Sequence, residues 1–277
     1  MNASLKKVIA EFLGTFTYLV AIAGASASES PFRGITAALT LGLMILTLGG
    51  ISGGHFNPAI SIYFFAKKTL SFGTLLSYIA AQLVGAFFGM AAGLALWEKT
   101  IQPFNPGNQV SASIFAGEVV ATAGLIFVIG TLINNKQAHL VWIAVTSWFF
   151  VASSFTVTSA FANPAVSFGW MFNGISTGST STIIVAQLVG LLVAILILMV
   201  TGASTAKKKA APAKKVAPAF VPAPIVSAPA AAAAKTVAKP AAKKPAAKKP
   251  VAKKAPAKAA AKPAVKKAPA KKAPAKK

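Results

Sequence analysis

The stretch "GGHFNPAIS" at residues 53–61 interrupts an apolar region with two glycines and a proline, and "SAFANPAVS" at 159–167 repeats its Asn-Pro-Ala triplet 106 residues later. Proline directly after asparagine suits the first turn of a helix, because that turn does not use the missing N–H. The asparagine then caps the helix by accepting a hydrogen bond from a free backbone N–H. Each triplet therefore predicts a helix that begins inside an apolar part of the chain.

Outside these two stretches, residues 1–206 are almost continuously apolar, which predicts an integral membrane protein rather than a soluble domain. A helix rises about 1.5 Å per residue, so about 20 apolar residues cross a hydrocarbon layer roughly 30 Å thick. We expect six crossings of this length, at 8–27, 35–51, 72–97, 114–133, 140–157 and 182–201.

Two shorter apolar segments, 57–66 and 163–173, follow the second and fifth crossings, and at this length each reaches only halfway across. Short or interrupted apolar segments at corresponding places in two halves of a chain indicate a binding site near the middle of the membrane. The sequence therefore predicts an all-α membrane protein with six transmembrane helices and two re-entrant half-helices.

Three pairs of landmarks show that the chain contains an internal repeat. Glutamates, motif asparagines and glutamines recur at offsets of 107, 106 and 105 residues, as Glu11 and Glu118, Asn57 and Asn163, and Gln82 and Gln187. Each repeat, at about 5–100 and 112–203, holds three crossings, so the second must enter from the opposite face. The two half-helices then meet tip to tip at the midplane.

This arrangement predicts the chemistry of the midplane. We expect the free side-chain amides of Asn57 and Asn163 to point into a shared space, where the positive ends of both half-helices oppose cations. The segments before the two caps cannot satisfy their carbonyls by helix formation, and such backbone is tolerated only in protein or along water. We expect a ladder of carbonyl acceptors from Gly53, Gly54, His55 and Phe56, and from Ser159, Ala160, Phe161 and Ala162. Such a path suits neutral polar solutes.

The paired triplets, together with "AEFLGT" at 10–15, "ISGGHFNPA" at 51–59 and "AQLVGA" at 81–86, resemble the aquaporin (major intrinsic protein) family of water and small-solute channels. The resemblance covers about residues 5–203. It implies a homotetramer of hourglass bundles, each with its own pore, and pore motifs formed by Asn57, Pro58, Ala59, Asn163, Pro164 and Ala165. It also implies that Glu11 and Glu118 brace the re-entrant loops, although both also suit a simpler role as acids favoured by a helix dipole.

The sequence departs from the family pattern at the selectivity filter. The arginine that usually follows the second motif is replaced by Val166, and counting along the pattern places its partners at Ala37, Val151 and Ala160. All four are small or medium and apolar. Pore diameter, lining donors and electrostatic barriers decide selectivity. We therefore expect a wider and less polar filter than that of a strict water channel, open to solutes such as glycerol or urea.

Other functions find little support in the composition. The chain has no cysteine and only four acids, all glutamate, so it offers no nucleophile and base pair, metal cluster or phosphate loop for catalysis. We expect no enzyme activity, no metal and no cofactor.

The lysines predict the orientation. Lys6, Lys7, Lys67, Lys68, Lys136 and the C-terminal tail all fall on one side of the membrane, which the positive-inside rule assigns to the cytoplasm. We therefore expect both termini in the cytoplasm and a plasma or inner membrane location.

The tail at 207–277 differs from the channel domain at 1–206. It holds 21 of the 28 basic residues and twelve prolines but no acid, a composition that predicts a disordered and largely extended chain. Such a tail is either a solvated tether or a binder of anionic lipid or nucleic acid. The alternative function is therefore a non-conducting membrane anchor whose purpose is the tail.

Overall fold

A computed structural model describes residues 2–102 and 104–201, and the predicted tail at 207–277 lies outside the described residues. The described residues form helices joined by loops, with no strand among them. Its elements are α1 (Ala3–Ala27), α2 (Arg33–Ser52), α3 (Pro58–Ala66), α4 (Phe72–Ala95), α5 (Ala112–Asn134), the 3₁₀ turn η1 (Ala138–Leu140), α6 (Val141–Phe155), α7 (Pro164–Trp170), the 3₁₀ turn η2 (Met171–Asn173) and α8 (Thr177–Val200).

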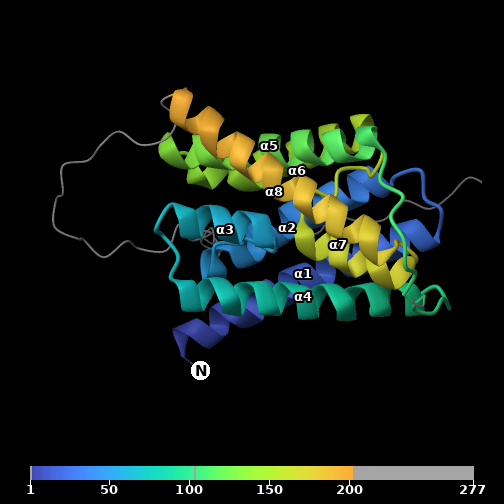
Figure 1. The fold of residues 1–277 in the computed structure, drawn as a ribbon. Coiled ribbons are helices and arrows are strands. Elements are labelled where there is room, and N and C mark those ends of the chain that lie inside the picture. The colour runs from blue at the N-terminus through green and yellow to red at the C-terminus, as the bar shows by residue number, and fades with distance from the viewer. Residues whose placement is uncertain (1, 103, 202–277) are drawn as a thin grey trace, which may run out of the picture. The chain divides into compact units, whose positions relative to one another are not determined.

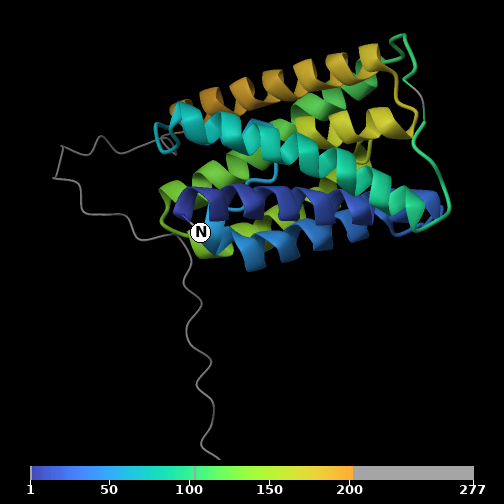
Figure 2. The same cartoon turned by 90° about the horizontal axis from the view of Figure 1, so that it is seen from below.

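Six of the described helical segments are long and apolar enough to cross a membrane, which confirms the expected number of crossings. The long helices form one bundle, and the start of α1 and the end of α8 lie at the same end of it (Figure 1). That placement follows from an even number of crossings. The view in Figure 2 shows α4 lying obliquely across α1.

Glycines allow the closest helix contacts, and they do so in the same way in both repeats. A side chain at Gly89 of α4 would place its Cβ 2.4 Å from the carbonyl oxygen of Phe16 in α1. In the second repeat, a Cβ at Gly190 of α8 would lie 2.5 Å from the oxygen of Val119 in α5. Small residues let membrane helices approach backbone to backbone. The α1–α4 and α5–α8 pairs therefore form matching halves of the bundle.

The two half-helices begin where the triplets predict. Pro58 and Pro164 occupy the first helical positions, and the side chains of Asn57 and Asn163 accept hydrogen bonds from the N–H groups of Ala59 at 2.8 Å and Ala165 at 2.9 Å. Helices α3 and α7 enter the bundle from opposite ends, with α7 to the right of α3 in Figure 1. The fold is therefore the inverted arrangement of two half-helices inside six long helices.

Candidate pore

The caps of the two half-helices are hydrogen-bonded to each other's loops. Asn57 Nδ2 donates to the carbonyl oxygen of Ala162, and Asn163 Nδ2 donates to that of Phe56, both at 2.8 Å. Both asparagines are buried, with exposed fractions of 2% and 1%. The reciprocal pair holds the beginnings of α3 and α7 side by side at one level of the bundle.

These bonds correct one expectation about the asparagines. Sequence reasoning left both N–H groups of each amide free for a solute, whereas the structure commits one of them to the opposite loop. An asparagine amide has two N–H donors. One donor therefore remains on Asn57 and one on Asn163.

Glu11 in α1 holds the first loop. Its Oε1 accepts from Ser52 Oγ at 2.6 Å and from the N–H of His55 at 3.0 Å, while Oε2 accepts from the N–H of Phe56 at 2.7 Å and from Gln82 Nε2 at 2.8 Å. The carboxylate has no exposed surface, so burial would be costly without these four donors. The geometry is that of a brace between α1 and the loop.

Glu118 in α5 holds the second loop in the same way. Its Oε1 accepts from Thr158 Oγ1 and from the N–H of Phe161 at 3.0 Å, and its Oε2 accepts from the N–H of Ala162 at 2.9 Å and from Gln187 Nε2 at 2.7 Å. The two glutamates therefore make equivalent bonds to equivalent groups, as the inverted repeat requires.

Gln82 and Gln187 belong to this network, although sequence reasoning gave them no role. Gln82 Nε2 also donates to Ser61 Oγ in α3 at 3.0 Å, and Gln187 Nε2 donates to Ser167 Oγ in α7 at 2.9 Å. Each glutamine thus ties its glutamate to the half-helix. The recurrence of "AQLVG" at an offset of 105 residues was the signal that could have found them.

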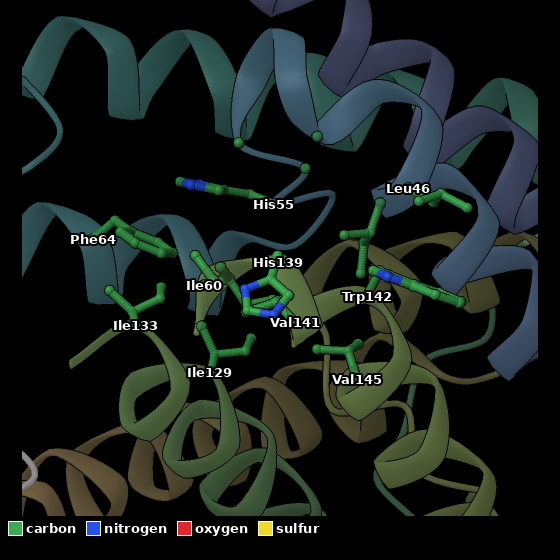
Figure 3. Close-up of a pocket in the computed structure, with 15 residues that line it drawn as sticks. Leu46, His55, Ile60, Phe64, Ile129, Ile133, His139, Val141, Trp142 and Val145 are labelled. Carbon is green, nitrogen blue, oxygen red and sulfur yellow. The ribbon is translucent and has the colours of Figure 1, made fainter. Parts of the chain in front are cut away.

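A cavity of about 230 Å³ lies among α2, the loop before α3, α3 itself, α5 and α6, and we call it the α3-side cavity. Its wall is mostly apolar, and His55, His139 and Trp142 supply the ring nitrogens that Figure 3 shows among aliphatic side chains. The lining residues are Ile45, Leu46, Gly49, Gly53, Gly54, His55, Ile60, Phe64, Ile129, Ile133, Ala138, His139, Val141, Trp142 and Val145.

The His55 ring has a fixed position in this cavity. It stacks on Phe64 with ring centroids 4.6 Å apart, and its Nδ1 lies 3.1 Å from Ser61 Oγ. Ser61 Oγ also accepts from Gln82 Nε2 at 3.0 Å, so the same hydroxyl joins the ring of His55 to the Glu11 network.

A second cavity, of about 310 Å³, lies at the opposite end, and we call it the α7-side cavity. The two cavities share α2, and Ala37 in one is separated from Ile45 in the other by about 12 Å of helix. The lining residues are Tyr18, Ile22, Arg33, Gly34, Ala37, Ile114, Val157, Thr158, Ser159, Ala160, Phe161, Val166, Trp170 and Ile175. Three of the four expected filter residues, Ala37, Ala160 and Val166, therefore come together.

Val151, the fourth, does not join them. Its side chain is 50% exposed and does not line the α7-side cavity. Successive helical residues point about 100° apart, and in α6 the buried positions are Val145, Thr146, Phe149 and Ala152. The register of α6 therefore directs Ala152 inward and Val151 outward, against the position obtained by counting along the family pattern.

The expected carbonyl ladder divides between the two cavities. Gly53, Gly54 and His55 line the α3-side cavity, and Ser159, Ala160 and Phe161 line the α7-side cavity. Phe56 and Ala162 line neither, and their carbonyls accept from the asparagines of the opposite repeat. The last residue of each segment is thus part of the junction between the loops.

Within residues 2–102 and 104–201, no cluster of three or more His, Cys, Asp or Glu side chains could hold a metal ion.

Comparison with known proteins places this geometry in a family. The sequence profile of the Major intrinsic protein family matches residues 1–151. The chain is 28% identical over 199 residues to "Aquaglyceroporin AqpS" of Rhizobium meliloti (strain 1021), covering 67% of this chain and 85% of the relative. It is 29% identical over 197 residues to "Aquaglyceroporin" of Toxoplasma gondii (strain ATCC 50611 / Me49), covering 68% and 73%.

The fold is similar to that in the "X-ray structure of the aquaglyceroporin from Plasmodium falciparum". The TM-score is 0.58 at 21% sequence identity, over 70% of this chain and 95% of the other. The profile match covers more than half of the chain and includes the first brace and the first triplet. The chain therefore belongs to the major intrinsic protein family, whose members are passive membrane channels rather than enzymes.

Proposed function

We propose that this multi-pass membrane protein is a passive channel for water and small neutral solutes such as glycerol, with the path running from one cavity to the other past Asn57 and Asn163. The reciprocal hydrogen bonds between the two loops carry the proposal, because they join the two caps. Loop residues before Asn57 line the α3-side cavity, and loop residues before Asn163 line the α7-side cavity. A continuous path through the bundle requires one cavity on each side of the joined caps.

The polar groups along the route favour neutral solutes that both donate and accept hydrogen bonds. Each asparagine keeps one N–H donor, and three residues of each loop lie at a cavity wall, where we propose that their carbonyls accept hydrogen bonds. Water and polyols satisfy both kinds of group. An ion would lose its hydration shell to a wall that is otherwise apolar, at high cost.

The filter is proposed to be wide and apolar. Ala37, Ala160 and Val166 present small side chains to the α7-side cavity, and none supplies a side-chain donor. The rings of Phe161 and Trp170 stack with centroids 5.5 Å apart and add a flat apolar wall. This lining suits the carbon skeleton of a small polyol or the flat face of urea.

Topology and assembly are proposed on the sequence and the family. Lys6, Lys67 and Lys136 belong to the end where α1 begins, and they favour cytoplasmic termini. The resemblance favours a homotetramer embedded in lipid, in which each protomer carries its own pore.

The basic tail supports a second, separate activity. We propose that the channel domain ends near residue 206 and that 207–277 contacts an anionic surface, either lipid headgroups or nucleic acid. Its 21 lysines without an acid carry this proposal, because each lysine near an anionic leaflet contributes on the order of 1 kcal/mol. Retention of the full chain, but not of 1–206, on anionic vesicles or on nucleic acid at low salt tests it.

Stopped-flow osmotic measurements on proteoliposomes test the channel. We expect vesicles with the full chain to respond to gradients of glycerol and urea faster than empty vesicles, and vesicles with 1–206 to behave alike. If neither protein accelerates any osmolyte, the anchor hypothesis replaces the channel.

A further inference from the structure

The α7-side cavity has one charged residue in its described lining, Arg33. Arg33 is the first residue of α2, and Ala37 follows one turn later on the same face of the helix. Both line the cavity. The backbone of Arg33 is therefore about 6 Å of helix rise from that of Ala37 in the filter.

Local helix stability does not account for an arginine at this position. The N-terminal end of a helix carries a partial positive charge, which favours acids and disfavours bases there. Helix α2 has no acid in its first turn. Glu29, the acid nearest in sequence, does not line the cavity. Arg33 is exposed and lines the cavity, so its charge acts on solutes that enter the cavity.

We propose that Arg33 guards the α7-side mouth against cations and so supplies the charge barrier that the filter itself lacks. Ala37, Ala160 and Val166 carry no charge. The Debye length is about 10 Å at 0.1 M salt, so a charge on the wall of the α7-side cavity acts on solutes that enter this cavity. A neutral solute passes this field without cost, whereas a cation does not. The inference rests on the proposed channel function.

Paired flux measurements on the full chain in proteoliposomes test the inference. Sodium influx and glycerol influx are measured on the same vesicles, and the sodium-to-glycerol ratio is compared for wild type, Arg33→Gln and Arg33→Lys. Lys99→Gln is the matched control, because Lys99 lies at the same end, donates to the carbonyl oxygen of Ala27 at 3.1 Å and does not line the cavity.

We expect Arg33→Gln to raise the ratio about tenfold, and Arg33→Lys and Lys99→Gln to leave it near the wild-type value. The rise in Arg33→Gln should be largest at about 10 mM salt and small at about 1 M salt, where the Debye length falls to about 3 Å.

An unchanged sodium-to-glycerol ratio in Arg33→Gln, with glycerol influx through the wild type intact, would contradict the proposed role of Arg33 but not the proposed channel function. A salt-independent rise, or a rise of the same size in Arg33→Lys, would also overturn it, since shape and not charge would then matter. Wild-type vesicles that take up glycerol no faster than empty ones would overturn both proposals.

Discussion

The loop before α3 and the loop before α7 have the same backbone but different side chains. Left-handed φ angles occur at the same three positions of each: 100°, 65° and 47° at Gly53, Gly54 and Phe56, and 57°, 58° and 42° at Ser159, Ala160 and Ala162. Glycine adopts such angles freely, whereas other residues pay about 1–2 kcal/mol each. The second loop therefore keeps a costly backbone without glycine.

The braces explain how the second loop keeps it. Glu11 and Glu118 each accept two backbone N–H bonds from their loop and two from side chains, so the conformation is fixed from outside the loop. Side chains are then free to differ. His55 places an imidazole ring in the wall of the α3-side cavity, while its counterpart Phe161 places a phenyl ring in the wall of the α7-side cavity. The two repeats therefore share the backbone conformation of the loops and differ in the side chains that line the cavities.

Removing a brace should have the largest effect, and the same effect in both repeats. Glu11→Gln or Glu118→Gln replaces a charged acceptor by an amide whose NH₂ faces donors, which should cost about 3–5 kcal/mol. Thermal unfolding in detergent and glycerol flux measure this loss. Glu98→Gln, at an exposed loop residue, is the control. A large loss of stability and flux in only one of the two variants would contradict the proposed equivalence of the loops.

Removing a cap should have the next largest effect. Asn57→Ala or Asn163→Ala deletes a capping bond and a bond to the opposite loop, leaving buried groups unpaired, at about 2–3 kcal/mol. The double variant should cost less than the sum of the two, because either change already separates the loops. The unfolding free energies of the wild type and the three variants form a double-mutant cycle. Strict additivity of the two single losses would argue against a shared junction.

Val166→Arg tests the difference between the two linings. A guanidinium at the α7-side cavity should lower glycerol and urea flux by about tenfold relative to water, since bulk and donors would narrow the filter. Val166→Leu, which adds bulk without donors, is the matched control. Unchanged glycerol and urea flux in Val166→Arg would contradict a wide filter at this position.

Exchanging the two ring residues should have the smallest effect. His55→Phe gives the first loop the lining of the second, and Ser61 Oγ can then donate to the carbonyl of Asn57, as Ser167 Oγ does to that of Asn163 at 3.2 Å. We expect less than about 1 kcal/mol of lost stability and a several-fold change in the ratio of glycerol to water flux. Phe161→His is the reciprocal variant. A loss as large as that of a brace would show that His55 supports the loop itself.

Sequence reasoning worked best where a local pattern carries the information. Proline after asparagine predicted the starts of α3 and α7, and hydropathy found all six long helices. It placed helix ends less well. The sixth crossing was predicted from 182, whereas α8 begins at Thr177, because Ser176 caps a polar first turn that no apolar window includes.

Two features of the pore depend on distances that a linear pattern does not contain. The bond from Asn57 to Ala162 joins residues 105 apart, so the sequence predicted free amides where the fold supplies a partner. Val151 was placed by counting, but an error of one residue in register turns a helical side chain by about 100°. The neighbouring Ala152 is the buried one.

We propose that one solute path connects the two cavities past the paired caps. Because the chain has no cysteine, single cysteines can be introduced and labelled without background. Ala37→Cys and Ile45→Cys place a thiol in each cavity on the same helix, and Val151→Cys places one outside both.

Glycerol flux into proteoliposomes, before and after a bulky methanethiosulfonate reagent, is the decisive measurement. Labelling at either Ala37→Cys or Ile45→Cys should block the flux, and labelling at Val151→Cys should not. Full flux after complete labelling at either cavity position would contradict a single path through the two cavities.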